Sequence, residues 1–236
     1  MSNYKRTEEY MANFTREKVL KILVDNDSPL IIDVGANMGQ SIEEFFSLWP
    51  NSRVIAFEPQ SECVKHIQTI KQNLNYQNLE IIESAVGSED KPEGLTFFSH
   101  NIESGITGHT SGLSGFNKFN LNSKDSINIQ KMDPSSKEHA DYTSRLNFER
   151  KVPCLRLDSF LSKKNLKTID LLKIDTQGFE PEVLAGAGDY LKSTKVVLTE
   201  LMFYDLYERK LTFSDIEKYL LPAGFELFDI SHISKN

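Results

Sequence analysis

The chain has 236 residues, 39% of them hydrophobic, which is enough to bury the core of one α/β domain. Its net charge of −7 argues against a broad basic face, so we expect no nucleic-acid partner. The N-terminus carries no long apolar run, and we therefore expect a soluble cytoplasmic protein without a membrane segment. The two cysteines, Cys63 and Cys154, fall in predicted elements and are expected to be core thiols in a reducing compartment.

Helices and strands are predicted to alternate along the chain. The pattern begins with a helix over residues 3–24, within an N-terminal helical segment of residues 1–27. Short apolar runs predict strands over residues 30–34, 53–58, 79–87, 95–99, 169–175, 195–200 and 225–230. Ser61 is expected to cap one intervening helix, and a capping box, Ser214-x-x-Glu217, to begin the last. This alternation predicts an α/β fold with a Rossmann-like, doubly wound, mostly parallel sheet.

A polar connection over residues 99–151 interrupts the alternation. It is rich in Ser, Asn, Gly and Lys and has few periodic apolar residues. A connection of this length inside a compact domain is either a functional lid or a solvated insertion without a direct role, and the sequence leaves both open. We find no internal repeat and no second domain, so residues 1–236 are expected to form a single domain.

The most informative segment is the turn after the first apolar strand, Asp33-Val-Gly35-Ala36-Asn37-Met-Gly39. A strand, a glycine-bearing turn and a helix start in succession form the place where an open α/β sheet holds a nucleotide-like ligand. Glycine lets the backbone approach such a ligand without a Cβ clash. Asp33 is expected either to orient the turn or to meet a cationic group of the ligand.

The next strand also ends in a carboxylate, Glu58, one βαβ unit after Asp33. A carboxylate at this position accepts both hydroxyls of a ribose, in dinucleotides or in S-adenosylmethionine. The dinucleotide fingerprint G-x-G-x-x-G is missing, because position 37 is Asn. The sulfonium and ammonium groups of S-adenosylmethionine are positive and suit the acids around the turn, so we favour it as the cofactor.

Five segments, in order, resemble those of the FkbM-type methyltransferases, a branch of the class I S-adenosylmethionine-dependent enzymes. They are residues 31–39 (IIDVGANMG), 56–59 (AFEP), 85–87 (AVG), 152–158 (VPCLRLD) and 170–180 (DLLKIDTQGFE). In the last segment Gln177 replaces the family's usual acid. The polar connection looks longer than is usual in the family, and the chain ends too soon after residue 230 for the seventh, antiparallel strand of class I methyltransferases.

The resemblance and the converging strand ends imply roles for individual residues. The residues expected to contact the cofactor are Asp33, Gly35, Ala36, Asn37, Gly39, Glu58, Pro59, Ser84, Ala85 and Asp175. Within this set Glu58 is expected to hold the ribose, and Ser84 and Ala85 to border the adenine. Asp175 is also the expected catalytic base toward an acceptor hydroxyl, paired with Lys173 as a second catalytic residue. Glu200 and His109 are the candidate substrate contacts.

The resemblance implies an S-adenosylmethionine-dependent O-methyltransferase whose acceptor is a hydroxyl of a sugar, glycan or secondary metabolite. Some O-methyltransferases place Mg²⁺ on acids at positions like those of Asp175 and Glu200, but no Asp-Asn pair follows Glu200, so we expect no metal. A non-catalytic cofactor-binding or scaffolding protein of the same fold is the alternative. A nicotinamide-dependent oxidoreductase is the third reading, and the oligomeric state is left open.

Overall fold

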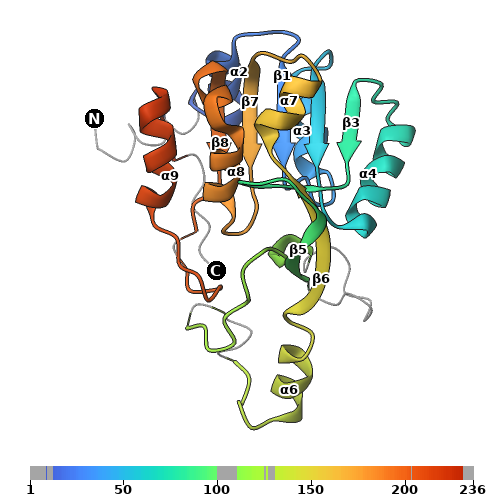
Figure 1. The fold of residues 1–236 in the computed structure, drawn as a ribbon, viewed down its shortest axis with the longest axis vertical. Coiled ribbons are helices and arrows are strands. Elements are labelled where there is room, and N and C mark those ends of the chain that lie inside the picture. The colour runs from blue at the N-terminus through green and yellow to red at the C-terminus, as the bar shows by residue number, and fades with distance from the viewer. Residues whose placement is uncertain are drawn as a thin grey trace.

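The computed structural model describes residues 9, 13–99, 111–124, 126, 131–202 and 204–230. Its centre is a sheet of five parallel strands in the order β3-β2-β1-β7-β8 (Figure 1). These strands are β1 (Leu30–Val34), β2 (Arg53–Phe57), β3 (Leu79–Ile82), β7 (Ile169–Ile174) and β8 (Thr194–Thr199). The strand order reverses between β1 and β7, which makes the carboxyl end of β1 the switch point where open sheets bind ligands.

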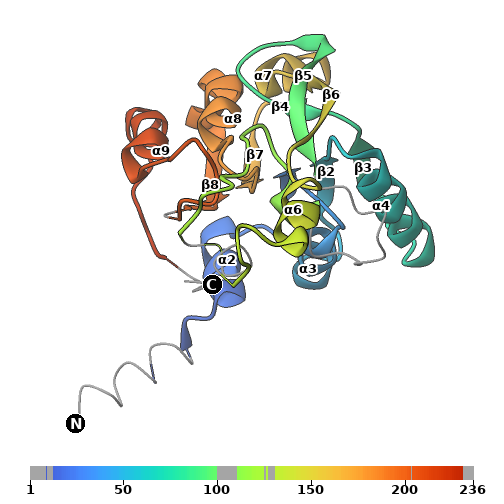
Figure 2. The same ribbon diagram turned by 90° about the horizontal axis from the view of Figure 1, so that it is seen from below.

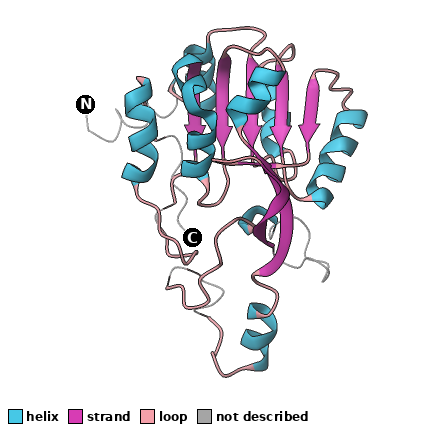
Figure 3. Ribbon diagram, viewed as in Figure 1, coloured by secondary structure: helices cyan, strands magenta, loops and turns pink. Residues whose placement is uncertain are grey.

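Helices cover both faces of the parallel sheet (Figure 3). They are α2 (Arg16–Val24), α3 (Gln40–Leu48), α4 (Ser61–Asn73), α7 (Leu157–Lys163), α8 (Glu180–Ala187) and α9 (Phe213–Leu220), with short 3₁₀ turns η2 (Gly188–Ser193) and η3 (Leu221–Ala223). Successive strand residues serve opposite faces, as the pleat requires. Ile32 and Val34 share a buried cluster with α7 and α8, whereas Ile31 shares one with α2 and α3. The predicted Rossmann-like, doubly wound fold is confirmed.

A second, smaller sheet, formed by segments on both sides of the polar connection, lies below the carboxyl ends of the parallel strands (Figure 1). This sheet has the order β4-β6-β5, formed by β4 (Ala85–Val86), β5 (Lys91–Ser99) and β6 (Phe148–Leu155), with β5 and β6 antiparallel. The helix α6 (Lys137–Thr143) lies between β5 and β6 in the chain and projects toward the viewer in Figure 2. The end of the predicted insertion, residues 148–151, is therefore strand and not polar loop.

Residues 111–124, which begin with the 3₁₀ turn η1 (Ser111–Leu113), return from this sheet to the main domain. Gly115 forms an antiparallel bridge with Phe98, and Phe119 forms one with Tyr207, in the segment between β8 and α9. Phe119 and Tyr207 also belong to a small separate core with Leu146 and Leu206. The insertion is thus anchored to two different parts of the chain at the ligand-binding end of the sheet.

The strand predicted over residues 225–230 is not formed. After η3 the chain reverses at Gly224 (φ +94°), and the Phe225 N–H donates to Leu220 O, which closes the end of the helix. Leu227, Phe228 and Ile230 are then 62%, 63% and 54% exposed. The apolar residues of this segment have no sheet face to cover, so the apolar run alone was a misleading signal.

Several predicted boundaries also differ from the structure. The predicted 79–87 strand divides into β3 and β4, which belong to different sheets. Ser61 is the first residue of α4, and Gln60 is its N-cap residue, so the predicted Ser61 cap was wrong. The capping box of α9 is formed by Thr212 and Asp215, because each accepts from the other's backbone N–H, and not by the predicted Ser-x-x-Glu pair. The predicted helix over residues 3–24 is wrong as one continuous element, because residues 14 and 15 are not helical and Thr15 caps α2; of the residues before them, only 9 and 13 are described.

Candidate functional site

A cavity lies at the carboxyl ends of β1, β2 and β7, and it encloses about 580 Å³ including the open space at its mouth. The predicted cofactor residues on its wall are Gly35, Asn37, Glu58, Pro59, Ser84, Ala85 and Asp175. These residues come from different strand ends and line the same cavity, because the carboxyl ends of parallel strands lie at one edge of the sheet. Asp33, Ala36 and Gly39 do not line this cavity and support the turn from behind.

The turn after β1 depends on glycine at Gly35. Its φ is +80°, and a Cβ at this position would overlap the backbone carbonyl oxygen of Asp175. The N–H groups of Gly35 and Ala36 both donate to Phe57 O, which ties the turn to the end of β2. Gly39 (φ +90°) then starts α3 as its N-cap residue. The turn is consequently packed between β2 and β7, with its backbone exposed to the cavity.

The Glu58 carboxylate is the buried acid of the cavity wall, and the residue is only 2% exposed. Its Oε2 accepts from the Asn37 N–H (2.8 Å) and its Oε1 from the Gln60 N–H (2.8 Å). Burial raises the pKa of Glu58 to about 7, against the opposing effect of these two backbone donors. The Gln60 side chain donates to this carboxylate as well, and at least one of its four acceptor positions remains for a hydroxyl donor from a ligand.

A buried ion pair lies directly behind the turn. Lys173 and Asp33 are register partners on adjacent strands, and Lys173 Nζ lies 3.1 Å from Asp33 Oδ1. The same ammonium donates to Gly35 O (2.8 Å) and lies 3.6 Å from Asp175 Oδ2. Burial alone would lower the pKa of Lys173, but the carboxylates of Asp33 and Asp175 outweigh it and raise the pKa, so the ammonium stays charged. Lys173 thus connects the turn with the acid at the end of β7.

Asp175 stands at the mouth of the cavity, with its side chain 43% exposed. Its Oδ1 accepts from Gln177 Nε2 (3.0 Å), and the same amide nitrogen donates to Glu200 Oε2 (2.8 Å). Glu200 itself lines a shallow neighbouring hollow beside α9 and not the main cavity. The predicted substrate contact His109 lies outside the described residues.

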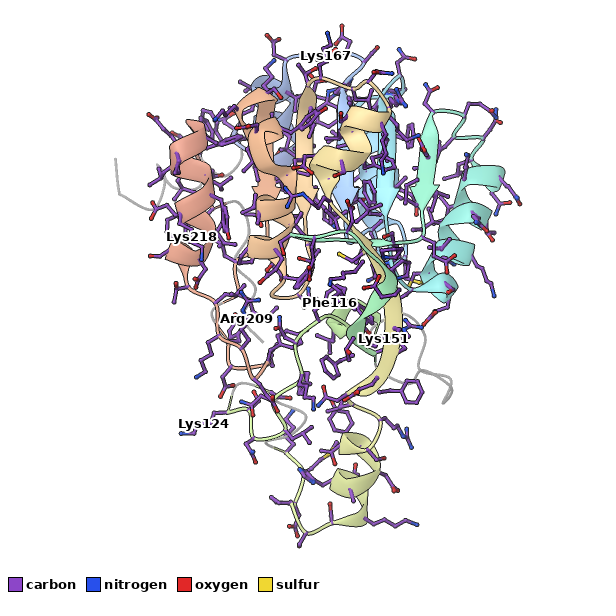
Figure 4. All side chains as sticks on the ribbon, viewed as in Figure 1. Phe116, Lys124, Lys151, Lys167, Arg209 and Lys218 are labelled. Atoms are coloured by element: carbon purple, nitrogen blue, oxygen red, sulfur yellow. The ribbon has the colours of Figure 1, made fainter. Side chains whose placement is uncertain are left out.

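Aromatic side chains that the sequence did not single out complete the cavity. Phe116 comes from the insertion, and Figure 4 shows it below the parallel sheet. Its ring lies 4.2 Å from that of Phe179 and edge-on to Phe97, which also lines the cavity. The serine-and-glycine-rich stretch before Phe116 was the available signal, but it did not show that this ring would reach the site. Ser84 Oγ is turned away from a ligand and lies within hydrogen-bond distance of Ala85 O and Pro153 O.

Within the described ranges, no three or more His, Cys, Asp or Glu side chains are grouped so as to hold a metal ion. None of the helices in that part of the chain combines the length and the apolar character that crossing a bilayer requires.

Comparisons with known proteins agree with this geometry. The family model described as the Methyltransferase FkbM domain matches residues 33–227. A relative, the "2-O-methyltransferase NoeI" of Sinorhizobium fredii, is 27% identical over 206 residues, which cover 87% of this chain and 75% of that protein. "Methyltransferase 1" of Beauveria bassiana is 27% identical over 164 residues, which cover 69% of this chain and 60% of that protein.

A solved structure of a methyltransferase FkbM from Methylobacillus flagellatus aligns with 70% of this chain and 30% of its own chain, at 13% identity and a TM-score of 0.41. The family model, in contrast, spans the glycine turn, the Glu58 strand end and the β7 exit in one continuous match. On that match, the chain belongs to the FkbM methyltransferase family.

Proposed function

We propose that this methyltransferase uses S-adenosylmethionine and methylates a hydroxyl group of a sugar, a glycan or a secondary metabolite. The observation that carries the proposal is the buried Glu58 carboxylate beside the Gly35 turn, at the switch point of the sheet. The name of the Sinorhizobium relative, a 2-O-methyltransferase, supports oxygen as the atom that accepts the methyl group. The acceptor is expected to be a small molecule or a glycan.

The residues of the cavity fit this cofactor. Gly35 and Asn37 line the cavity, so the backbone of the turn is available to the methionine part of the ligand. The Glu58 carboxylate lines the cavity and is suited to accept from the ribose hydroxyls. Phe97 and Phe116 add aromatic surface to the wall that also contains Ala85, where we expect the adenine.

When bound, S-adenosylmethionine supplies a methyl group attached to an electron-poor sulfur. The protein's own task is to align an acceptor hydroxyl with that methyl group and to take the hydroxyl proton. Asp175 is suited to the second task, because its carboxylate lines the cavity and remains partly exposed. Lys173 lies behind the wall and is 7% exposed, so we assign it a positioning role beside the Asp175 carboxylate.

Calorimetry followed by methyl-transfer assays tests the proposal. We expect calorimetry to show binding of S-adenosylhomocysteine and no binding of NAD. Methyl-labelled S-adenosylmethionine is then offered with a panel of sugars, glycans and hydroxylated metabolites. Asp175→Asn should retain S-adenosylhomocysteine binding and lose about 100-fold or more in transfer rate, the usual contribution of a general base.

The outcomes separate the alternatives. Absence of S-adenosylhomocysteine binding refutes the proposed cofactor, and binding of NAD in its place supports the oxidoreductase reading. Binding of S-adenosylhomocysteine without transfer to any acceptor supports the non-catalytic reading, particularly if a pull-down with this protein recovers a protein partner.

A further inference from the structure

One side-chain amide, that of Gln177, lies between the two acids at the mouth of the cavity. Its Nε2 donates to Asp175 Oδ1 (3.0 Å) and to Glu200 Oε2 (2.8 Å), so both amide protons are used. Its Oε1 lies 3.0 Å from Tyr207 Oη. An ionised carboxylate only accepts hydrogen bonds, so the nitrogen end of the amide suits these acids whenever they are charged. The phenol of Tyr207 on the other side has a single proton, for which the amide oxygen and Leu113 O compete.

The insertion holds the backbone from which this amide projects. Gln177 has φ +55°, a left-handed conformation that costs a residue with a Cβ about 1 kcal/mol. Asn117 Nδ2 donates to Gly178 O (2.9 Å) and lies 3.4 Å from Gln177 O. Gly115 packs so closely that a Cβ on it would lie 3.3 Å from Gln177 Cβ. Contacts from the insertion therefore stabilise a strained backbone position that the turn would not hold alone.

A second route joins the insertion to the same amide. Tyr207 Oη lies 2.7 Å from Leu113 O, in the η1 turn of the insertion, as well as beside Gln177. Tyr207 is 2% exposed, so its hydroxyl needs these partners in place of water. The position of the insertion and the orientation of the Gln177 amide are consequently coupled.

The charges around Glu200 show why a donor matters there. Loss of hydration raises the pKa of Glu200 to about 8, repulsion from Asp175 and Glu180 acts in the same direction, and Lys173 opposes both. The side chain keeps part of its surface open to solvent, which moderates this shift. The remaining surroundings of Glu200 in the shallow hollow are largely apolar and include Leu201, Met202, Phe213 and Ile216.

We propose that Gln177 is a positioning residue for methyl transfer: its amide holds Asp175 and Glu200 side by side and keeps the Asp175 carboxylate turned toward the acceptor. Its catalytic role rests on the proposed function, whereas the amide bridge is a property of the protein without ligand. Without the amide, no side chain of this hydrogen-bond network bridges the two acids, which repel when both are ionised, and Asp175 is free to turn toward Lys173, 3.6 Å away. An acid at position 177, as in the motif that this segment resembles, would add a third negative group in place of the bridge.

A carboxyl titration tests the bridge without any acceptor. Protein labelled with ¹³C in the glutamate carboxyl groups is titrated by NMR, and the Glu200 signal is assigned from its loss in Glu200→Gln. We expect a midpoint above the ordinary glutamate value of 4.5 in the wild type. In Gln177→Leu the midpoint should rise by about one unit, a tenfold change in proton affinity, because the charged form loses its donor. Tyr207→Phe should give a smaller rise, since it leaves the amide in place.

Matched controls and a kinetic measurement complete the test. Gln77→Leu, in the exposed turn after α4, should leave the Glu200 midpoint unchanged. With an acceptor in hand, Gln177→Leu should bind S-adenosylhomocysteine as the wild type does and should lose tenfold or more in kcat. An unchanged Glu200 midpoint in Gln177→Leu overturns the bridge, whether or not the protein methylates anything. A shifted midpoint with wild-type kcat overturns the positioning role.

Discussion

The raised pKa of Glu58 predicts that cofactor affinity depends on pH. Ribose hydroxyls donate to an ionised carboxylate, so we expect binding to require the charged form of Glu58. With a pKa of about 7, about one molecule in eleven is charged at pH 6 and about ten in eleven at pH 8. The apparent Kd for S-adenosylhomocysteine should therefore fall about tenfold from pH 6 to pH 8, which is about 1.4 kcal/mol. Calorimetry at both pH values measures this change.

The same acid has an opposite effect on the stability of the ligand-free protein. Its folded-state pKa lies above its value of 4.5 in an unfolded chain, so its contribution to stability is complete below pH 4.5 and is lost as the pH rises to about 7. The loss is on the order of 3 kcal/mol. Stabilisation by S-adenosylhomocysteine, seen as a rise in Tm, should consequently be larger at pH 8 than at pH 6.

Two variants and a second ligand make this prediction refutable. Glu58→Gln should bind more weakly and without the pH dependence, whereas Glu83→Gln, at the exposed end of β3, should behave as the wild type does. 5′-Methylthioadenosine retains the ribose and adenine but lacks the amino-acid part, so it should show the same tenfold change if Glu58 is its source. A wild-type Kd that is equal at the two pH values, or a Glu58→Gln variant of unchanged affinity, refutes the ribose role.

Three further predictions concern the packing of the site. Gly35→Ala should lower the free energy of unfolding by more than about 2 kcal/mol and abolish S-adenosylhomocysteine binding. Gly224→Ala is the control, because Gly224 has a similar φ and no atom lies near the added Cβ. In urea denaturation, the control should lower the free energy of unfolding by only about 1 kcal/mol, through backbone strain. Lys173→Met should cost about 3–5 kcal/mol by leaving Asp33 buried and unpaired, and adding Asp33→Asn should restore much of that stability in a double-mutant cycle. Phe116→Ala should weaken S-adenosylhomocysteine binding in calorimetry, because the Phe116 ring lines the cavity from the insertion. Its far-ultraviolet circular dichroism should stay close to that of the wild type.

The parallel sheet was predictable because its strands are short, fully buried apolar runs between turn residues. β1, β2 and β7 are buried at nearly every position, so they show no polar alternation, and their length distinguishes them from helices. Residues 225–230 have a similar apolar content, but whether such a run becomes a strand depends on a sheet edge and a face to cover. Neither condition can be read from the segment itself.

The cofactor side of the site was predictable for a related reason. Gly35 and Glu58 occupy positions defined by their own strand ends, so the chain's local pattern was enough to find them. Phe116, Gln177 and Tyr207 act through partners from distant segments, and no spacing rule connects an insertion to the loop after another strand. The replacement of an acid by Gln177 was visible in the sequence, but its meaning required the positions of Asp175 and Glu200.

Several contacts join the turn after β1 to Asp175, the acid after β7. The Asp175 N–H donates to Val34 O, the Asp175 carbonyl occupies the space that a Cβ on Gly35 would need, and Lys173 bonds the Gly35 carbonyl while facing the Asp175 carboxylate. A ligand that displaces the turn must therefore also displace the acid at the cavity mouth. Since the insertion holds that acid from the other side through Gln177, cofactor and acceptor are expected to bind with mutual dependence. Independent affinities for the two ligands would show that the contacts around Asp175 do not transmit this displacement.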